Sequence, residues 1–248
     1  MASSNGKKRG RRSFLKTSVA AVGAVGAAGT AAGEVGSGEQ PSASRPGVSL
    51  QARAYNGRYA GEQLSRVAFP LGGMGAGMIC LEGTGALSHV SLRHRPEVFN
   101  EPCVFAAVWV KGAASVARVL EGPVPAWKLY GRPEAANGLG GTSYGLPRFR
   151  SATFLARFPF GSVTLEDARV ALTAEVTGWS PFEPGDADGA SLPVAALEYS
   201  FRNPTSAPLD VVFSWNARNF LPAPKGRQSV RATRGGFVLW GTGAPEEP

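Results

Sequence analysis

The sequence predicts an all-β fold for most of the chain, in the form of a two-sheet antiparallel β-sandwich. Several short runs alternate apolar and polar residues with a period of two, which is the pattern of half-buried strands. Glycine (33 residues) and proline (19 residues) are abundant, and helical patterns are scarce after the first fifty residues. The 248 residues include 43% hydrophobic residues, enough to bury a sizeable core.

The first 32 residues are predicted to form an export signal. A basic stretch, KKRGRRSFLK at 7–16, precedes a stretch of Ala, Gly and Val at 17–32. This second stretch has no Leu or Ile and is weaker than the ~20 strongly apolar residues that a membrane span needs. Ala31 and Ala32, just before Gly33, are the best cleavage candidates among several alanines. Residues 33–52 are rich in Gly, Ser and Pro and are predicted to form a flexible linker, which leaves 53–248 as the folded domain.

The basic stretch resembles a twin-arginine signal, in which two arginines and any residue precede Phe-Leu-Lys. The residues that carry the resemblance are Arg11, Arg12, Phe14, Leu15 and Lys16. It implies export to the periplasm or outside the cell through the twin-arginine translocase, and hence passage of an already folded protein. The alternative is a disordered basic tail that contains an Arg-Arg pair.

The net charge of +8 does not predict nucleic-acid binding. Residues 1–46 carry seven basic and two acidic residues, or +5, so the remaining 202 residues carry only +3. The body of the chain has no run of Lys or Arg of the kind that forms a nucleic-acid surface. We therefore expect no nucleic-acid partner.

A glycine-rich loop is the most unusual segment of the body. Its four glycines lie within six residues, which disfavours both helix and central strand; they are Gly72, Gly73, Gly75 and Gly77. A short strand at 79–81, a turn at 82–85 and another short strand at 87–92 are expected to follow. The spacing fits neither a dinucleotide fingerprint nor a phosphate loop, so we predict no cofactor.

The remaining elements follow in order along the chain. Residues 105–110 are expected to be a buried strand, and 121–150, rich in Gly, Pro and Asn, a long excursion that lines a functional surface. Four alternating runs then predict strands of antiparallel meanders, with a turn at 203–206 between the last two. These runs centre on 154–158, 170–176, 197–201 and 209–215, and a further strand is expected at 237–240.

No catalytic or metal-binding residue can be assigned from pattern alone. His89 and His94 are five apart, which is not a standard metal spacing, and we predict no metal. Cys80 and Cys103 are either one disulfide or two reduced thiols. The five tryptophans are either buried or available to stack on sugars. The carboxylates near candidate loops show no pattern of a general acid or nucleophile; they are Glu82, Glu97, Glu101, Glu166, Asp167, Glu183, Asp186 and Asp188.

Several stretches together resemble the N-terminal domain of glycoside hydrolase family 116, the family of non-lysosomal glucosylceramidase (bile acid β-glucosidase). The resemblance covers about residues 55–240. It rests on FPLGGMGAG at 69–77, LEGTGAL at 81–87, HRPEVFNE at 94–101, WSPFEP at 179–184, LPV at 192–194 and EYSFRN at 198–203.

The resemblance implies a β-sandwich that packs on a C-terminal (α/α)6 barrel. In the family, the barrel carries a Glu nucleophile and an Asp acid/base for retaining β-glycoside hydrolysis. The sequence here contains no such barrel, so no catalytic residue can be carried over. The resemblance implies that this chain is the inactive N-terminal portion of an exported β-glucosidase or glucosylceramidase-like enzyme of carbohydrate or glycolipid metabolism. Its barrel would belong to the same or a separately encoded chain, and the glycine loop would shape the domain interface or the mouth of the barrel.

The sequence also allows two other functions. A standalone carbohydrate-binding or interaction module, with a β-glycoside as ligand, would show an exposed coplanar pair of Trp or Tyr side chains. An enzyme with its own site in this domain would need two carboxylates that converge in a cleft.

Overall fold

The computed structural model describes residues 53–92, 95–97, 101–112, 114–130, 143–220 and 227–242. All of them belong to the compact unit Ser49–Pro248. The predicted signal motif, the linker and His94 lie outside the described residues. None of the described helices has the length and apolar character needed to cross a membrane.

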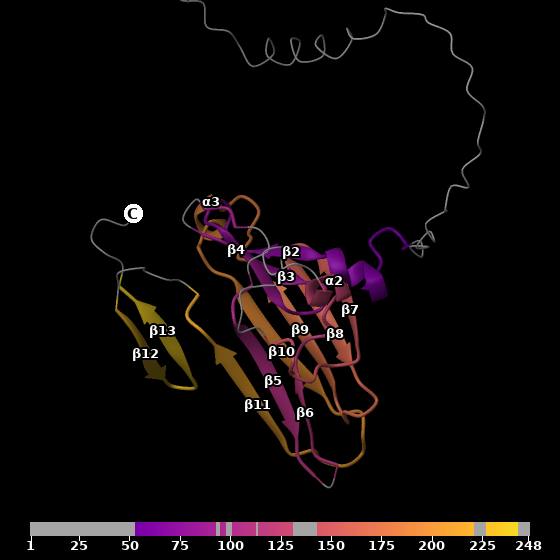
Figure 1. Cartoon of the computed structure of the whole chain (residues 1–248). Helices are drawn as coiled ribbons and strands as arrows, with labels where there is room; N and C mark the ends of the chain where they lie inside the picture. The colour runs from indigo at the N-terminus through magenta and orange to yellow at the C-terminus, as the bar shows by residue number, and fades with distance from the viewer. Residues whose placement is uncertain are drawn as a thin grey trace, which may run out of the picture. The chain divides into compact units, whose positions relative to one another are not determined.

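The first layer is a five-stranded antiparallel sheet in the order β1-β7-β8-β9-β10 (Figure 1). Three of its strands confirm predicted alternating runs, although β9 begins only at Thr173, after Val170 and Leu172 of the second run. The first run ends earlier than expected, because β7 stops at Arg157 and Phe158 lies in the turn before β8, 61% exposed. The strands are β1 (Tyr59–Ala60), β7 (Ser151–Arg157), β8 (Phe160–Glu166), β9 (Thr173–Trp179) and β10 (Ala196–Arg202).

The second layer is a three-stranded antiparallel sheet in the order β11-β5-β6. It contains β5 (Val104–Val110), the predicted buried strand, together with β6 (Val116–Val119) and β11 (Val211–Ala217). The turn after β10 does not close a hairpin, since β11 pairs with β5 rather than with β10. Asn203 shapes this turn by accepting the Thr205 N–H at 2.9 Å and donating to the Ala207 carbonyl at 2.7 Å. The chain therefore changes layer at this turn.

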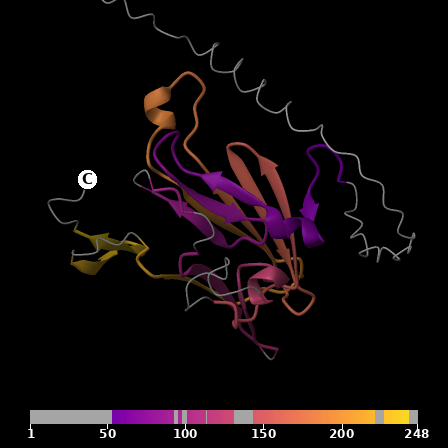
Figure 2. The ribbon, with the colours of Figure 1, turned by 45° about the horizontal axis from the view of Figure 1, so that its top comes forward.

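Two smaller sheets complete the described strands. β2 (Ala68–Leu71), β3 (Met78–Glu82) and β4 (Leu87–Ser91) form one, and β12 (Gln228–Thr233) and β13 (Gly236–Gly241) form a hairpin. The helices are short: η1 (Gly61–Arg66), α2 (Ala126–Tyr130) and α3 (Ala187–Ala190). The orange helix α3 is at the tip of the long connection between β9 and β10 (Figure 2). The all-β class and the sandwich are thus confirmed.

One apolar cluster joins the two layers and the β2-β3-β4 sheet. Val108 of β5 and Phe154, Val163 and Val176 of the five-stranded sheet are each at most 1% exposed and belong to it. This continuous burial stabilises the sandwich.

A pair of glycines lets the β2-β3-β4 sheet sit on the five-stranded sheet. Gly161 and Gly178 are cross-strand neighbours on β8 and β9. A Cβ atom at Gly161 would meet the Phe69 ring at 2.8 Å, and one at Gly178 would meet Leu71 Cδ1 at 2.7 Å. The missing side chains make the flat area on which β2 packs. This contact fixes where the glycine-rich loop, which follows β2, begins.

Candidate functional site

The glycine-rich loop connects β2 to β3 and is held by two outside contacts and one internal hydrogen bond. The Gly72 N–H donates to Ser180 Oγ at 3.0 Å, and the Met74 N–H donates to the Ala190 carbonyl at 2.9 Å. Within the loop, the Ala76 N–H donates to the Gly73 carbonyl at 3.1 Å. The loop is therefore tied to β9's end and to α3, which are more than a hundred residues away in sequence.

Two glycines show why the loop excludes other residues. A Cβ atom at Gly73 would lie 2.1 Å from the Leu192 carbonyl oxygen, so the loop backbone needs this close approach to the chain leaving α3. Gly75 has no neighbour within 4 Å of such an atom, but its φ of +76° favours glycine. The structure thus gives the loop the close approach and positive φ expected from its composition. Its role at a domain interface stays a prediction.

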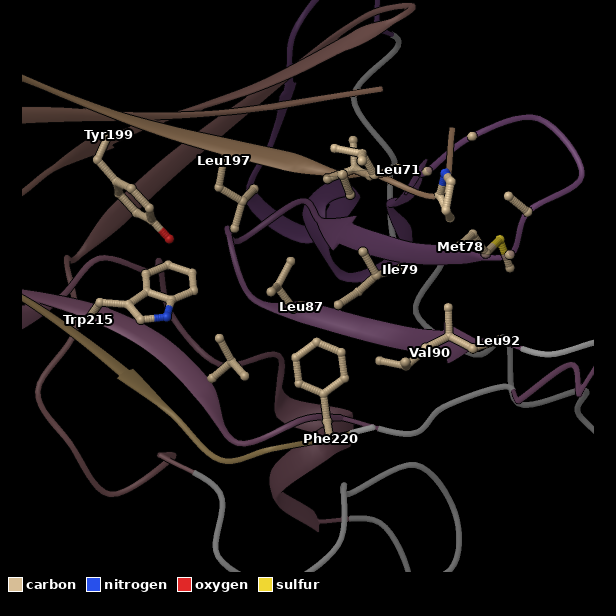
Figure 3. Close-up of a pocket in the computed structure, with 18 of the residues that line it drawn as sticks. Leu71, Met78, Ile79, Leu87, Val90, Leu92, Leu197, Tyr199, Trp215 and Phe220 are labelled. Atoms are coloured by element: carbon tan, nitrogen blue, oxygen red, sulfur yellow. The ribbon is translucent and has the colours of Figure 1, made fainter. Parts of the chain in front are cut away.

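The loop forms a wall shared by two cavities. Leu71, Gly72, Gly73, Ala76, Gly77 and Met78 line both of them. The first has a volume of about 580 Å³ and lies between the two layers, with walls from β10 and β11 (Figure 3). The second has a volume of about 630 Å³ and lies on the other side of the loop, beside Pro181. Both volumes lie within the range of small-molecule sites, about 300–1,000 Å³.

The first cavity is lined almost wholly by apolar side chains. Ile79, Leu87, Val90 and Leu197 point into it (Figure 3). Tyr199 of β10 supplies a hydroxyl, and its ring centroid lies 5.8 Å from that of Trp215 on β11 in an edge-on arrangement. Burial raises the pKa of Tyr199 far above its ordinary value, and the negative charge of Glu121 adds to the effect. The hydroxyl is therefore a neutral donor at any physiological pH.

The second cavity combines apolar side chains with a charged group at its edge. Phe158 and Phe182 meet edge to face with centroids 4.9 Å apart, and they are 61% and 37% exposed. Met74 of the loop is 54% exposed, and Arg95 lies in the same wall. Exposed apolar side chains gathered in a concave surface are typical of interaction sites.

A buried ionic cluster lies elsewhere in the domain and involves the described ends of the excursion, 121–130 and 143–150. Lys128 of α2 is 3% exposed, and its Nζ lies 2.6 Å from Glu82 Oε1 and 2.7 Å from Oε2. Lys128 also contacts Glu101, whose other carboxylate oxygen accepts the Tyr144 hydroxyl. The ammonium group thus joins α2 to β3 and to the segment before β5, and Glu101 extends the link to Tyr144 at the end of the excursion.

A second ion pair lies beside the first. Arg148 Nε donates to Glu121 Oε2 at 3.0 Å, and the same guanidinium donates to the Ser143 carbonyl and hydroxyl at 2.8 and 2.6 Å. Burial raises the pKa of Glu121 above its ordinary value despite the pairing with Arg148, and the negative charge of Glu82 contributes. Among the described members of this cluster, three carboxylates face two cations.

An active site within this domain would need two carboxylates that converge in a cleft, and the cluster contains the described pair that comes nearest to this. Glu82 and Glu101 do meet, but both are ion-paired to the same ammonium group and covered by the protein. Two other candidate carboxylates have hydrogen-bond partners outside the cluster. Asp167 pairs with Arg118 at 2.9 Å. Asp186 caps α3 through the Gly189 N–H at 2.9 Å, in an exposed loop.

The cysteines take the less specialised of their two predicted roles, whereas three of the five tryptophans are exposed rather than buried. Cys80 and Cys103 are both free thiols, and burial, with the nearby charge of Glu82, raises the pKa of Cys80 to about 11. Trp109, Trp127 and Trp240 are exposed, but on three separate elements, β5, α2 and β13. In the part of the chain that the structure describes, these three rings form no stacked pair with another aromatic ring.

Comparison with known families identifies the class of the domain. Residues 68–236, from the start of β2 to the start of β13, match the family described as beta-glucosidase 2, glycosyl-hydrolase family 116 N-terminal domain. The class is therefore that of the β-sandwich domains of glycoside hydrolases. No curated protein matches the sequence. Because the family match covers more than half of the chain, the chain belongs to glycosyl-hydrolase family 116, through its N-terminal domain.

Proposed function

We propose that this chain is the N-terminal β-sandwich portion of an exported, retaining β-glucosidase or glucosylceramidase-like hydrolase. The enzyme acts on β-glycosides in carbohydrate or glycolipid metabolism. The observation that carries the proposal is the family match over residues 68–236. Hydrolysis depends on an (α/α)6 barrel in the same or a separately encoded chain.

The ionic cluster supports a structural rather than a catalytic role for this domain's carboxylates. A retaining glycosidase needs two carboxyl groups about 5–5.5 Å apart on either side of the scissile bond, one ionised and one able to donate a proton. Glu82 and Glu101 instead both bind the buried ammonium group of Lys128. We therefore expect the chain alone to be inactive.

The glycine loop and the second cavity are the proposed contact surface for the barrel. Met74, Phe158 and Phe182 expose apolar area there, and the loop backbone is fixed by its bonds to Ser180 and Ala190. A rigid, concave and partly apolar surface suits a domain interface. Coplanar exposed Trp or Tyr rings would favour the alternative, a standalone carbohydrate-binding module. The exposed rings at this surface are instead Phe158 and Phe182, and their planes meet at 69°.

Coding DNA gives the direct test of the barrel. The sequence that follows the codon for Pro248 would be read in all three phases and in the neighbouring genes. We expect a helical barrel with Glu and Asp motifs in frame, after a single-base shift or in an adjacent gene. Unrelated sequence in each of these places would contradict the proposal and favour the standalone module, which a glycan-binding screen would then examine.

Export can be tested separately in cells. Replacing Arg11 and Arg12 with Lys should keep the charge but block recognition by the twin-arginine translocase, so the protein should remain in the cytoplasmic fraction. A control in which Lys7 and Lys8 become Gln keeps the motif and should still be exported. Equal export of the Arg11→Lys, Arg12→Lys variant and the wild type would rule out this route.

A further inference from the structure

The cavity between the two layers has the size and lining of a ligand site. Its volume of about 580 Å³ lies within the usual range for small-molecule sites. Side chains of Leu71, Ile79, Leu87 and Leu197 enter it from the β2-β3-β4 sheet and from β10 (Figure 3). Such a surface favours an apolar molecule, because burying apolar area is the main source of its binding free energy.

Two hydrogen-bond donors make one end of the cavity polar. The Tyr199 hydroxyl and the Trp215 indole N–H lie in the wall on facing strands, β10 and β11 (Figure 3). Within the described residues, neither group has a hydrogen-bond acceptor, although their rings contact each other. Polar groups in such positions ordinarily have partners. A ligand oxygen at this end would accept from both.

The charges around the cavity select among ligands with such an oxygen. None of the described residues that line the cavity is Lys, Arg or His, so a carboxylate or phosphate would meet no counter-charge from them. An anionic head group would lose its hydration there without gaining a counter-charge. A neutral hydroxyl, ester or amide oxygen avoids this penalty.

We propose that this cavity binds an uncharged amphiphile, with its apolar body among the leucine and isoleucine side chains and its neutral oxygen accepting from Tyr199 and Trp215. The site shares the glycine-loop wall with the proposed barrel contact but lies on the other side of the loop, and it does not rest on the proposed glycosidase function. It would give this domain a ligand of its own.

Trp215 provides a direct reporter of occupancy in the purified 248-residue chain. Decanol that carries a bromine on the carbon next to the hydroxyl-bearing carbon would place the bromine beside the Trp215 indole and quench its fluorescence. We expect saturable quenching that decanol reverses. Decane lacks the acceptor and decanoate carries a charge, so each should compete at least about 5-fold less well than decanol. In Trp215→Phe, the saturable part of the quenching should disappear while the other tryptophans still emit.

Variants separate the contributions of the donor and of the cavity. Tyr199→Phe removes one hydroxyl and should weaken decanol binding about 2- to 10-fold while leaving decane unchanged. Leu197→Phe partly fills the cavity and should weaken both. Val212→Phe places the same ring on the outward face of β11, outside the cavity, and should change neither. Thermal unfolding of each variant checks that it is folded.

The outcomes are decisive in either direction. Saturable quenching with the order decanol above decane and decanoate, lost in Trp215→Phe and weakened in Tyr199→Phe, would establish the site. Absence of saturable quenching in the wild type, equal binding of decanoate, or an unchanged Tyr199→Phe would overturn it. Absence of binding together with slow hydrogen exchange along the free edges of β10 and β11 would show that a polypeptide segment fills the space instead, which also overturns the proposal.

Discussion

The ionic cluster around Lys128 and the cavity beside Tyr199 lie in one domain but are built in opposite ways. The cluster is polar, covered and internally paired, with Lys128 bound to two carboxylates and Glu101 also bound to Tyr144. The cavity is lined by apolar side chains, and its two donors lack acceptors among the described residues. Groups that already satisfy one another hold a fold together, whereas unsatisfied groups around a space leave room for a ligand. We therefore assign the cluster around Lys128 to the stability of the domain and propose only the cavity beside Tyr199 as a binding site.

The largest expected effect comes from breaking the cluster. Lys128→Met should lower the free energy of unfolding by about 3–5 kcal/mol, because Glu82 and Glu101 would remain buried without their cation. Urea unfolding followed by circular dichroism would measure it. Lys111→Met is the matched control, since Lys111 pairs with Asp210 at the surface at 3.0 Å and should contribute less than about 1 kcal/mol. Equal losses in the two variants would contradict the structural role of the cluster.

The glycine loop should show an intermediate effect. In Gly73→Ala, the new Cβ atom would lie 2.1 Å from the Leu192 carbonyl, so the loop or the segment after α3 must move, at a cost of about 1–3 kcal/mol. Gly75→Ala should cost about 1 kcal/mol, from its positive φ alone. Gly145→Ala meets no neighbour within 4 Å and serves as the control, with no loss expected. If Gly73→Ala proved as stable as the control, the close approach would not hold the loop.

The smallest effect, and the one most dependent on conditions, concerns Glu121. Its raised pKa means that the folded state binds a proton more tightly than the unfolded state does, for which the ordinary value is 4.5. The stabilisation from this proton is fully present below pH 4.5 and is lost as the pH rises through the folded-state pKa. The stability of the wild type relative to Glu121→Gln should therefore fall as the pH increases above 4.5.

Urea unfolding at a series of pH values would measure this difference. Glu198→Gln, which alters an exposed side chain on β10, controls for the loss of one surface carboxylate. A stability difference between wild type and Glu121→Gln that instead grew with pH would mean that the Arg148 pairing outweighs burial.

Most of the first layer could be predicted from the sequence, and the reason is local. Alternation along β7, β9 and β10 reports directly which side chains face the core. The strand β8 escaped prediction because Gly161 interrupts its alternation, where Phe69 occupies the space of a side chain. The layer change before β11 also escaped, since a turn sequence shows that the chain bends but not which strand it next pairs with.

The site could be predicted only in part. The glycines at 72–77 were recognisable because their backbone requirement is local. Lys128 was not, because its partners Glu82 and Glu101 are 46 and 27 residues away, and a single lysine in a short helix carries no pattern. The cavity forms because β10 of the five-stranded sheet faces β11 of the three-stranded sheet. The sequence of neither strand shows which strand it will face.

The central claim is that the carboxylates meeting in this domain maintain its structure and that hydrolysis requires the barrel. The most direct test measures hydrolysis of a chromogenic β-glucoside by the purified, folded 248-residue chain. We expect a rate equal to that of buffer, unchanged in Glu82→Gln and Glu101→Gln. Hydrolysis above buffer that is lost in either variant while the variant remains folded would contradict the account and place an active site at the cluster.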